Sequence, residues 1–318
     1  MLGIGRTFAR LFTPRANKTA TPQAETSPKP SEPPAPSPAV HVRRKATGLA
    51  AEYRDHFDFQ DEMKALASEN PDKVKLLELG HSVKGRVISA MSIGTGPVGL
   101  VVSGLVHGCE WTTGEATMEL GKRLLKDRPE LLDKVTLLAV PVSNPDAHEV
   151  SRGVIGGQRA NLNGVDPNRN WPVNWGTNAN TPKQICHEYG GTGPSPLSEP
   201  ETQALAELTD QKHNVKGWLD LHSHGEILLT PGNDRPQAYE GLIADMQKST
   251  SKPYKALNIQ EFQDIPGSLA DYCESKGIIA VGAELGTKHK PRGDEREAVV
   301  QDGVNLGMAF VEHFARES

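Results

Sequence analysis

Short apolar runs alternate along the chain with amphipathic stretches. Two such runs, at 73–80 and 86–94, are separated by the short polar segment 81–85, which predicts two strands joined by a turn. Apolar runs predict further strands at 98–106, 135–144, 215–223 and 278–285. Helical periodicity predicts helices at 50–68, from about Thr112 or Thr113 onward, at 199–211 and at 266–277. This alternation predicts an α/β domain of three layers, with a mixed, mainly parallel sheet flanked by helices.

The first part of the chain has a different composition. From Thr13 to about Val40 it consists mostly of Pro, Ser, Thr and Ala. Prolines lack the backbone donor that helix and sheet require, and too little apolar surface is present to offset the entropy of the chain. We therefore predict a disordered tail at 1–47 and a folded domain at 48–318. The arginines within 1–15 are compatible with a targeting segment as well as with a frayed terminus.

The composition limits the partners that the chain can have. Its net charge of -5 provides no basic field for nucleic acid, so we expect none as a partner. No apolar stretch approaches the roughly 20 residues needed to cross a bilayer, so we expect a soluble protein without a transmembrane segment. The compartment stays open, with the cytoplasm favoured. Cys109, Cys186 and Cys273 are too widely spaced for a disulfide framework or a metal knuckle, which predicts buried or idle thiols.

Polar residues follow three of the predicted strands. His107, His222 and Glu284 each come at the end of an apolar run. Open α/β sheets place ligand sites at the carboxyl ends of their strands, so we expect these side chains to converge.

The residue types at these positions suit a catalytic metal site. Glu110 lies three residues after His107 in HGCEW, and His222 stands in LDLHSHG. An HxxE motif alone is in most sequences a structural histidine beside a surface glutamate. Two histidines and one glutamate, however, leave a fourth zinc position open, which is the catalytic arrangement.

Other residues supply the remaining chemistry of peptide hydrolysis. Glu284, flanked by apolar residues in VGAELG, is a candidate base, because water that attacks a carbonyl must lose a proton. Arg159 and Arg169 supply fixed positive charge, and an arginine can hold a carboxylate through two parallel hydrogen bonds. Arg169 with Asn168 suits the terminal carboxylate of a substrate.

An ordered series of motifs extends from about residue 50 to the end of the chain. It comprises LGHSVKGRVISAMSIG, HGCEW, NPD, RANLNGVDPNRNW, SEPET, LDLHS, GSLADY and AELG. In this order the chain resembles the zinc metallocarboxypeptidase family of the carboxypeptidase A and B type, peptidase family M14.

The resemblance implies one zinc ion and a role for each matching residue. His107, Glu110 and His222 would be the zinc ligands, and Glu284 would be the general base and acid. Arg159 would polarise the scissile carbonyl. Three further residues have implied roles: Asn168 and Arg169 would bind the C-terminal carboxylate, and Asp166 would orient the first zinc histidine. The implied substrate is a peptide with a free carboxylate, cleaved at its last bond by water that zinc and Glu284 activate.

The chain departs from the family pattern at several positions. In an ungapped alignment back from Glu284, Phe262 occupies the place of the usual substrate-capping tyrosine, and the sequence leaves open whether Tyr254 or Tyr272 replaces its hydroxyl. The same alignment places Leu269 at the base of the side-chain pocket, which disfavours a basic C-terminal residue. His224 stands where a bulky aromatic residue is common, so it either contacts substrate or fills space. The family's NPDG is NPDA here.

Other functions remain open at this stage. One alternative is an amidohydrolase of the succinylglutamate desuccinylase or aspartoacylase kind, which acts on N-acyl amino acids and shares the ligand pattern. The segments SEPET, NPD and NRNW favour a peptidase instead. A carboxypeptidase that trims murein peptides is a second alternative. Two more alternatives remain: a non-catalytic peptide-binding protein and a protein whose zinc ion is purely structural. The intact Glu284 and Arg159 disfavour the non-catalytic protein.

Overall fold

The chain is described here from a computed structural model. The structure describes residues 41, 43, 46–153, 157–176, 190–231, 237–259 and 265–316. Most of the predicted tail at 1–47 lies outside these residues. A compact unit spans Ser37–Ser318, and the predicted domain start at residue 48 stays a prediction.

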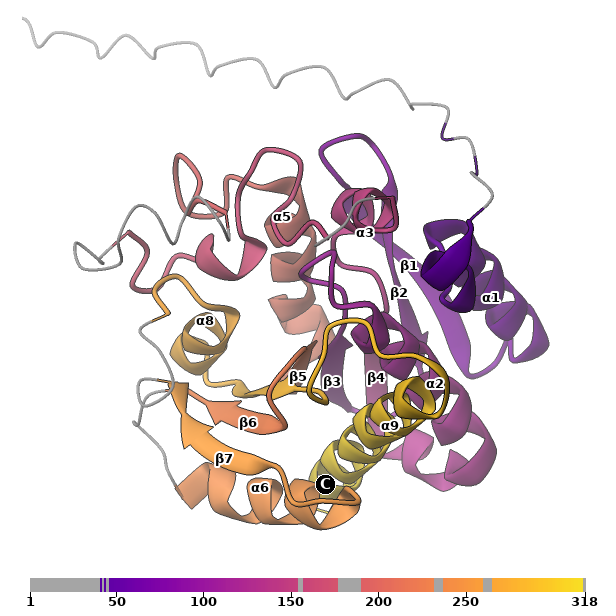
Figure 1. Ribbon diagram of the computed structural model, residues 1–318. Coiled ribbons are helices and arrows are strands. Elements are labelled where there is room, and N and C mark those ends of the chain that lie inside the picture. The colour runs from indigo at the N-terminus through magenta and orange to yellow at the C-terminus, as the bar shows by residue number, and fades with distance from the viewer. Residues whose placement is uncertain are drawn as a thin grey trace, which may run out of the picture. The chain divides into compact units, whose positions relative to one another are not determined.

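The described residues contain an eight-stranded sheet in the order β1-β2-β4-β3-β5-β8-β6-β7 (Figure 1). The pairs β3/β4, β3/β5, β5/β8 and β6/β7 are parallel, whereas β1/β2, β2/β4 and β6/β8 are antiparallel. The predicted mixed, mainly parallel sheet is therefore confirmed. The strands are β1 (Val74–His81), β2 (Val87–Ile93), β3 (Val98–Ser103), β4 (Val135–Val140), β5 (Val215–His222), β6 (Ile227–Thr230), β7 (Lys255–Asn258) and β8 (Ile279–Glu284).

Helices cover both faces of this sheet. The α-helices in the described residues are α1 (His56–Glu69), α2 (Trp111–Asp127), α3 (Pro145–Ser151), α5 (Pro200–Ala206), α6 (Gln237–Ser249), α8 (Leu269–Ser275) and α9 (Gly293–Arg316). Short 3-10 helices are η1 (Gly48–Glu52), η2 (Pro129–Asp133), η3 (Pro167–Arg169), η4 (Glu207–Thr209) and η5 (Gln211–His213). None of the helices described is long and apolar enough to cross a membrane.

The alternation of side chains along the central strands creates two cores. Leu100 and Val102 of β3 belong to a cluster with apolar residues of α1, α2, α6 and α9. Val101, between them, belongs to a second cluster with residues of α5 and α8. Because successive strand residues point to opposite faces, a strand buried on both faces is apolar throughout, which explains the unbroken runs in the sequence.

The predicted elements are present, with corrections at their ends. The single helix predicted at 50–68 is wrong in its first part, where the structure has η1 and then α1. Asp55 causes the break, because its side chain and that of Asp58 form a reciprocal cap at the start of α1. The strand predicted at 135–144 stops at Val140, since Pro141 follows and has no amide hydrogen to donate. Helices α3, α6 and α9 and strands β6 and β7 were not predicted.

Helix α9 packs closely against α2 on one face of the sheet (Figure 1). Small residues allow this approach. A side chain at Gly303 would lie 2.7 Å from the Cβ atom of Ala116, and one at Gly307 would lie 2.5 Å from Leu120. These two glycines are four residues apart and therefore share one face of α9.

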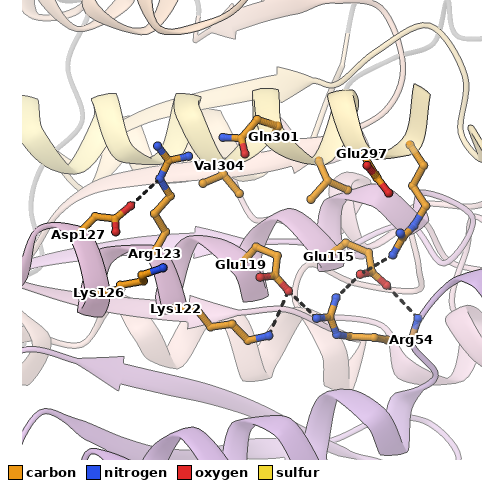
Figure 2. A pocket seen from close by; sticks show the side chains of 12 residues that line it. Arg54, Glu115, Glu119, Lys122, Arg123, Lys126, Asp127, Glu297, Gln301 and Val304 are labelled. Atoms are coloured by element: carbon orange, nitrogen blue, oxygen red, sulfur yellow. Dashed lines mark hydrogen bonds and ion pairs between the residues drawn. The ribbon is translucent and has the colours of Figure 1, made fainter. Parts of the chain in front are cut away.

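A charged groove of about 500 Å³ lies beside the contact between α2 and α9 (Figure 2). Its inner carboxylate is Glu115, which is 1% exposed and accepts a hydrogen bond of 2.9 Å from the backbone amide of Arg54. The guanidinium groups of Arg54 and Arg296 both pair with Glu115, and Arg54 also pairs with Glu119. None of the predicted site residues lines this groove, as far as the chain is described.

We expect Glu115→Ala to destabilise the fold by about 3 kcal/mol, because it leaves two partly buried guanidinium groups without their shared carboxylate. Glu119→Ala is the matched control on the same helix. Its side chain is 37% exposed, so the expected loss is below about 1 kcal/mol. Urea denaturation followed by circular dichroism measures both values. Equal, small losses in the two variants would show that the groove contributes no stability.

Candidate metal centre

The ends of three adjacent strands define the candidate site. Strands β3, β5 and β8 are neighbours in the centre of the sheet and run parallel. His222 is the last residue of β5 and Glu284 is the last residue of β8, and the two are direct partners in the register. His107 comes four residues after Ser103, the last residue of β3. The predicted convergence of these side chains at the carboxyl ends of the strands therefore follows from the topology of the sheet.

The segment between β3 and His107 is not strand, contrary to the prediction for 98–106. Leu105 has a φ of 50°, a left-handed conformation that is uncommon for a residue with a side chain. The backbone is held there from two sides. The amide of Leu105 donates to the hydroxyl oxygen of Thr113 (2.8 Å), and its carbonyl accepts from the amide of Asn144 (3.0 Å). This turn redirects the chain so that His107 reaches over the sheet edge.

Gly108 explains one departure from the family pattern. A Cβ atom at Gly108 would lie 2.3 Å from the carbonyl carbon of Ala147 and 2.5 Å from its methyl group. The HGCEW turn thus packs directly on the start of α3, and only a residue without a side chain fits at this position. Ala147 is compatible with the turn because Gly108 leaves space for its methyl group.

The three predicted metal ligands form a compact triangle. His107 Nδ1 lies 2.9 Å from Glu110 Oε1 and 3.2 Å from His222 Nδ1, and the latter lies 3.2 Å from Glu110 Oε2. Each residue is at most 4% exposed. Tetrahedral zinc with bonds of about 2.0–2.1 Å separates its ligand atoms by roughly 3.3 Å. The donor atoms of His107, Glu110 and His222 are therefore already spaced to fit such an ion.

Each imidazole is held by a carboxylate on its far side. His107 Nε2 lies 3.0 Å from Asp166 Oδ1, the contact that the sequence predicted for Asp166. His222 Nε2 lies 2.8 Å from Asp220 Oδ2. A carboxylate at Nε2 favours the tautomer that carries its hydrogen there, which leaves the lone pair of Nδ1 for a metal.

Asp220 is a site residue to which the sequence analysis gave no role. It is 5% exposed and accepts a hydrogen bond of 2.6 Å from Ser103, which in turn accepts one of 2.7 Å from the ring nitrogen of Trp218. The signal was present in the sequence, because Asp220 lies two residues before His222 on one strand and therefore on the same face.

The charges of the triangle depend on each other. Burial opposes ionisation of Glu110, but His107 and His222 hold the pKa of its carboxyl far below the usual range. Burial also opposes protonation of His222, but Asp220 and Glu110 raise the pKa of its imidazole well above the usual value. The carboxylates thus attract positive charge to a point where a metal ion can take the place of a proton.

Glu284 differs from the other carboxyl groups. Burial raises its pKa to about 7 in the metal-free chain, with an opposing effect of His222 and a smaller raising effect of Glu110. The carboxyl group of Glu284 therefore lies within the electrostatic influence of the triangle. A carboxyl group that titrates close to neutral pH can both accept and return a proton.

The predicted arginines lie on the Asp166 side of the triangle. Arg159 Nε donates to Asp166 Oδ2 (3.0 Å), and its Nη1 lies 3.5 Å from Glu110 Oε1. Arg169 Nη1 donates to the carbonyl oxygen of Asn168 (2.9 Å) and lies 3.9 Å from Asp166 Oδ2. Asn168 Nδ2 lies 3.4 Å from His222 Nε2. The structure therefore brings Arg159, Asn168 and Arg169 together with the metal triangle.

The residues predicted for the specificity pocket have mixed outcomes. Phe262 lies outside the described residues. Leu269 is 3% exposed in the second core, and its amide donates to Asn168 Oδ1 (2.9 Å). His224 is exposed, with its ring centroid 4.7 Å from that of His289. Whether these three residues contact a substrate stays a prediction.

Neither tyrosine considered as a replacement hydroxyl is directed at the triangle. The hydroxyl of Tyr254 accepts from the amide of Gly286 (3.3 Å) and lies 3.4 Å from Asp302. The hydroxyl of Tyr272 lies 3.4 Å from that of Thr209. Both hydroxyls are engaged in contacts of the fold.

Comparison with known proteins agrees with this geometry. Residues 59–289 match the model of the zinc carboxypeptidase family, peptidase family M14. The chain belongs to this family. It is 27% identical over 252 residues to carboxypeptidase A2 of Rattus norvegicus, a match that covers 73% of the chain and 60% of that relative. The chain thus spans less than two thirds of the length of such relatives.

Two further proteins are similar to the chain, one in structure and one in sequence. The crystal structure of carboxypeptidase A from Helicoverpa armigera shares the fold with a TM-score of 0.71 at 22% identity, covering 85% of this chain and 75% of that one. The inactive metallocarboxypeptidase ECM14 of Ajellomyces dermatitidis is 29% identical over 231 residues, which cover 63% of this chain and 38% of that protein.

We expect Asp220→Ala to lower the affinity for zinc about 10- to 100-fold, because the imidazole of His222 loses the carboxylate that orients it. Asp245→Ala, a surface change on α6, is the control and should leave the affinity unchanged. Competition with a chromophoric chelator measures both affinities. An unchanged affinity in Asp220→Ala would mean that the strand carboxylate does not orient a metal ligand.

Proposed function

We propose that the chain is a zinc-dependent metallocarboxypeptidase that hydrolyses the C-terminal peptide bond of its substrate. The observation that carries this proposal is the register pairing of His222 with Glu284. This pairing sets the candidate base beside the three candidate metal ligands. Asn168 Nδ2 lies 3.4 Å from Nε2 of the same imidazole, and Arg169 donates to the carbonyl oxygen of Asn168. We place the catalytic domain at 48–318.

One zinc ion would be held by Nδ1 of His107, Nδ1 of His222 and the carboxylate of Glu110. When bound, the ion supplies Lewis-acid chemistry, which polarises a carbonyl oxygen and acidifies water. Two observations support this assignment: the three ligand atoms lie close together, and a carboxylate lies behind each imidazole.

Glu284 would perform both proton transfers. It accepts a proton from the attacking water as the water oxygen bonds to the carbonyl carbon. It then delivers that proton to the amide nitrogen as the carbon–nitrogen bond breaks. The proton left on the attacking oxygen passes to the departing amine, so that the products are a carboxylate and an ammonium group. Burial raises the pKa of Glu284, and positive charge at the neighbouring ligands opposes this rise, which would keep the carboxylate ionised as a base at neutral pH.

The two arginines would have distinct roles. Arg159 lies near Glu110 and beside Asp166, so it is placed to stabilise negative charge on a carbonyl oxygen near the metal. Arg169 and Asn168 would bind the terminal carboxylate, which positions the last peptide bond over Glu284. This arrangement makes the free carboxylate the source of exopeptidase specificity. Leu269 next to Asn168 disfavours a basic C-terminal residue.

We expect Glu284→Gln to lower kcat by about 10²- to 10⁴-fold while zinc stays bound, because the amide keeps the shape of the side chain but cannot accept the proton. Glu78→Gln, at a side chain that is 63% exposed, is the matched control and should retain full activity. Release of the C-terminal amino acid from peptides, together with metal analysis of the same samples, measures both quantities.

The substrate used in this assay separates the candidate activities. Peptides with a free C-terminus should be cleaved, and the same peptides with an amidated C-terminus should not. Preferential cleavage of N-acyl amino acids or of murein peptides would assign the same site to one of those substrate classes. Full activity of Glu284→Gln, or zinc binding without any hydrolysis in the unmodified chain, would contradict the proposal.

A further inference from the structure

A second group of metal-ligating residues lies next to the zinc triangle. Ligand atoms of Cys109, Glu110 and His289 all lie within 4.8 Å of one another. Cys109 is 6% exposed, Glu110 is 1% exposed and His289 is partly buried. A thiolate, a carboxylate and an imidazole are the three side-chain types that bind zinc in proteins. Glu110 is the member that this group shares with the triangle.

The chain positions the two unshared residues from different elements. Cys109 lies in the HGCEW turn, directly before Glu110. His289 lies between β8 and α9, where its Nδ1 is 3.3 Å from the hydroxyl oxygen of Ser223 and its ring faces that of His224 at 4.7 Å. The contact with Ser223 orients the imidazole, as hydrogen bonds behind metal-bound histidines commonly do.

The backbone at Gly157 packs closely against Cys109, and a side chain at this position would not fit. A side chain at Gly157 would lie 2.7 Å from the Cβ atom of Cys109 and 3.0 Å from the ammonium nitrogen of Lys290. Lys290 donates to the carbonyl oxygen of Ser151 (3.3 Å) and lies 4.3 Å from the centre of the Trp111 ring. Its positive charge, together with that of Arg159, opposes a second cation, so a site here would be weaker than the triangle.

We propose that Cys109, His289 and Glu110 bind a second thiophilic divalent cation, such as zinc or cobalt, and that Glu110 bridges it to the first. A carboxylate has two oxygens, and in two-metal sites the ions lie about 3.5–4 Å apart. An ion with bonds of about 2.0–2.3 Å holds its ligand atoms roughly 3.3–3.8 Å apart. The ligand atoms of these three residues lie within 4.8 Å of one another. The bridging role of Glu110 rests on the proposed zinc site. Binding by Cys109 does not depend on turnover.

Sharing Glu110 has a functional consequence. The second ion would withdraw charge from the carboxylate that holds the first, and it would lie near His224, whose ring centroid is 4.7 Å from that of His289. Metal ions in excess of one equivalent should therefore inhibit the enzyme. Inhibition by excess zinc should weaken when Cys109 is replaced.

The test is a titration of the metal-free full chain with cobalt(II). Equilibrium dialysis gives the number of ions bound, and the near-ultraviolet charge-transfer band of a thiolate bound to cobalt shows whether sulfur is a ligand. We expect two ions per chain, with the band appearing only as the second ion binds. Cys109→Ser should bind one ion and lack the band. Cys273→Ser is the matched control, because Cys273 is also a buried free thiol, and it should retain both ions.

The outcomes separate this proposal from the proposed function. One ion and no thiolate band in the unmodified chain would overturn the second site alone. A failure to bind any ion would overturn the zinc site as well. His289→Ala provides an independent variant should Cys109→Ser fail to fold, as judged by circular dichroism. Loss of the second ion in His289→Ala supports the site, and its retention there contradicts it.

Discussion

The site is organised by the need to compensate charge that is buried at the centre of the sheet. Glu110, Asp166 and Asp220 are each at most 5% exposed and stand around two imidazoles. Isolated carboxylates at such depth would cost several kcal/mol each, so they persist only with cations or hydrogen-bond donors around them. Arg159 supplies one positive charge, and the two histidines supply the rest as protons or as ligands of a cation. The same requirement explains why the histidines cannot rotate, since each is held by a carboxylate on its outer nitrogen.

The topology of the sheet makes this concentration of charge possible. Parallel strands β3, β5 and β8 end at one edge, and their apolar bodies are buried on both faces by helices. The strand bodies therefore contribute stability, while their last residues are available for chemistry. Helices α2 and α9, packed through Gly303 and Gly307, cover one face of the sheet. The rigid strands thus fix the positions of the side chains at their carboxyl ends.

Much of the fold and of the candidate site could be predicted from the sequence. Apolar runs identified the central strands, because burial on both faces leaves a continuous signal, and His107, His222 and Glu284 were placed by their position at the ends of those runs. Strand β6 and the edge strand β7 have only four residues each, so they left too weak a pattern. Helix α9, with 24 residues, was not predicted; it begins at Gly293 and contains Gly303 and Gly307, and glycine is a poor helix former. The proximity of Cys109 to His289 could not be predicted, because the two residues are far apart in the chain and His289 lies in a segment without helix or strand periodicity.

Diffraction from crystals loaded with one equivalent of zinc, recorded on both sides of the zinc absorption edge, tests the central claim most directly. The claim predicts one dominant anomalous peak, at about 2.0–2.2 Å from Nδ1 of His107, Nδ1 of His222 and the carboxylate of Glu110, with Asp166 and Asp220 still on the outer nitrogens. A peak that lies elsewhere, or that leaves His222 beyond bonding distance, would contradict it.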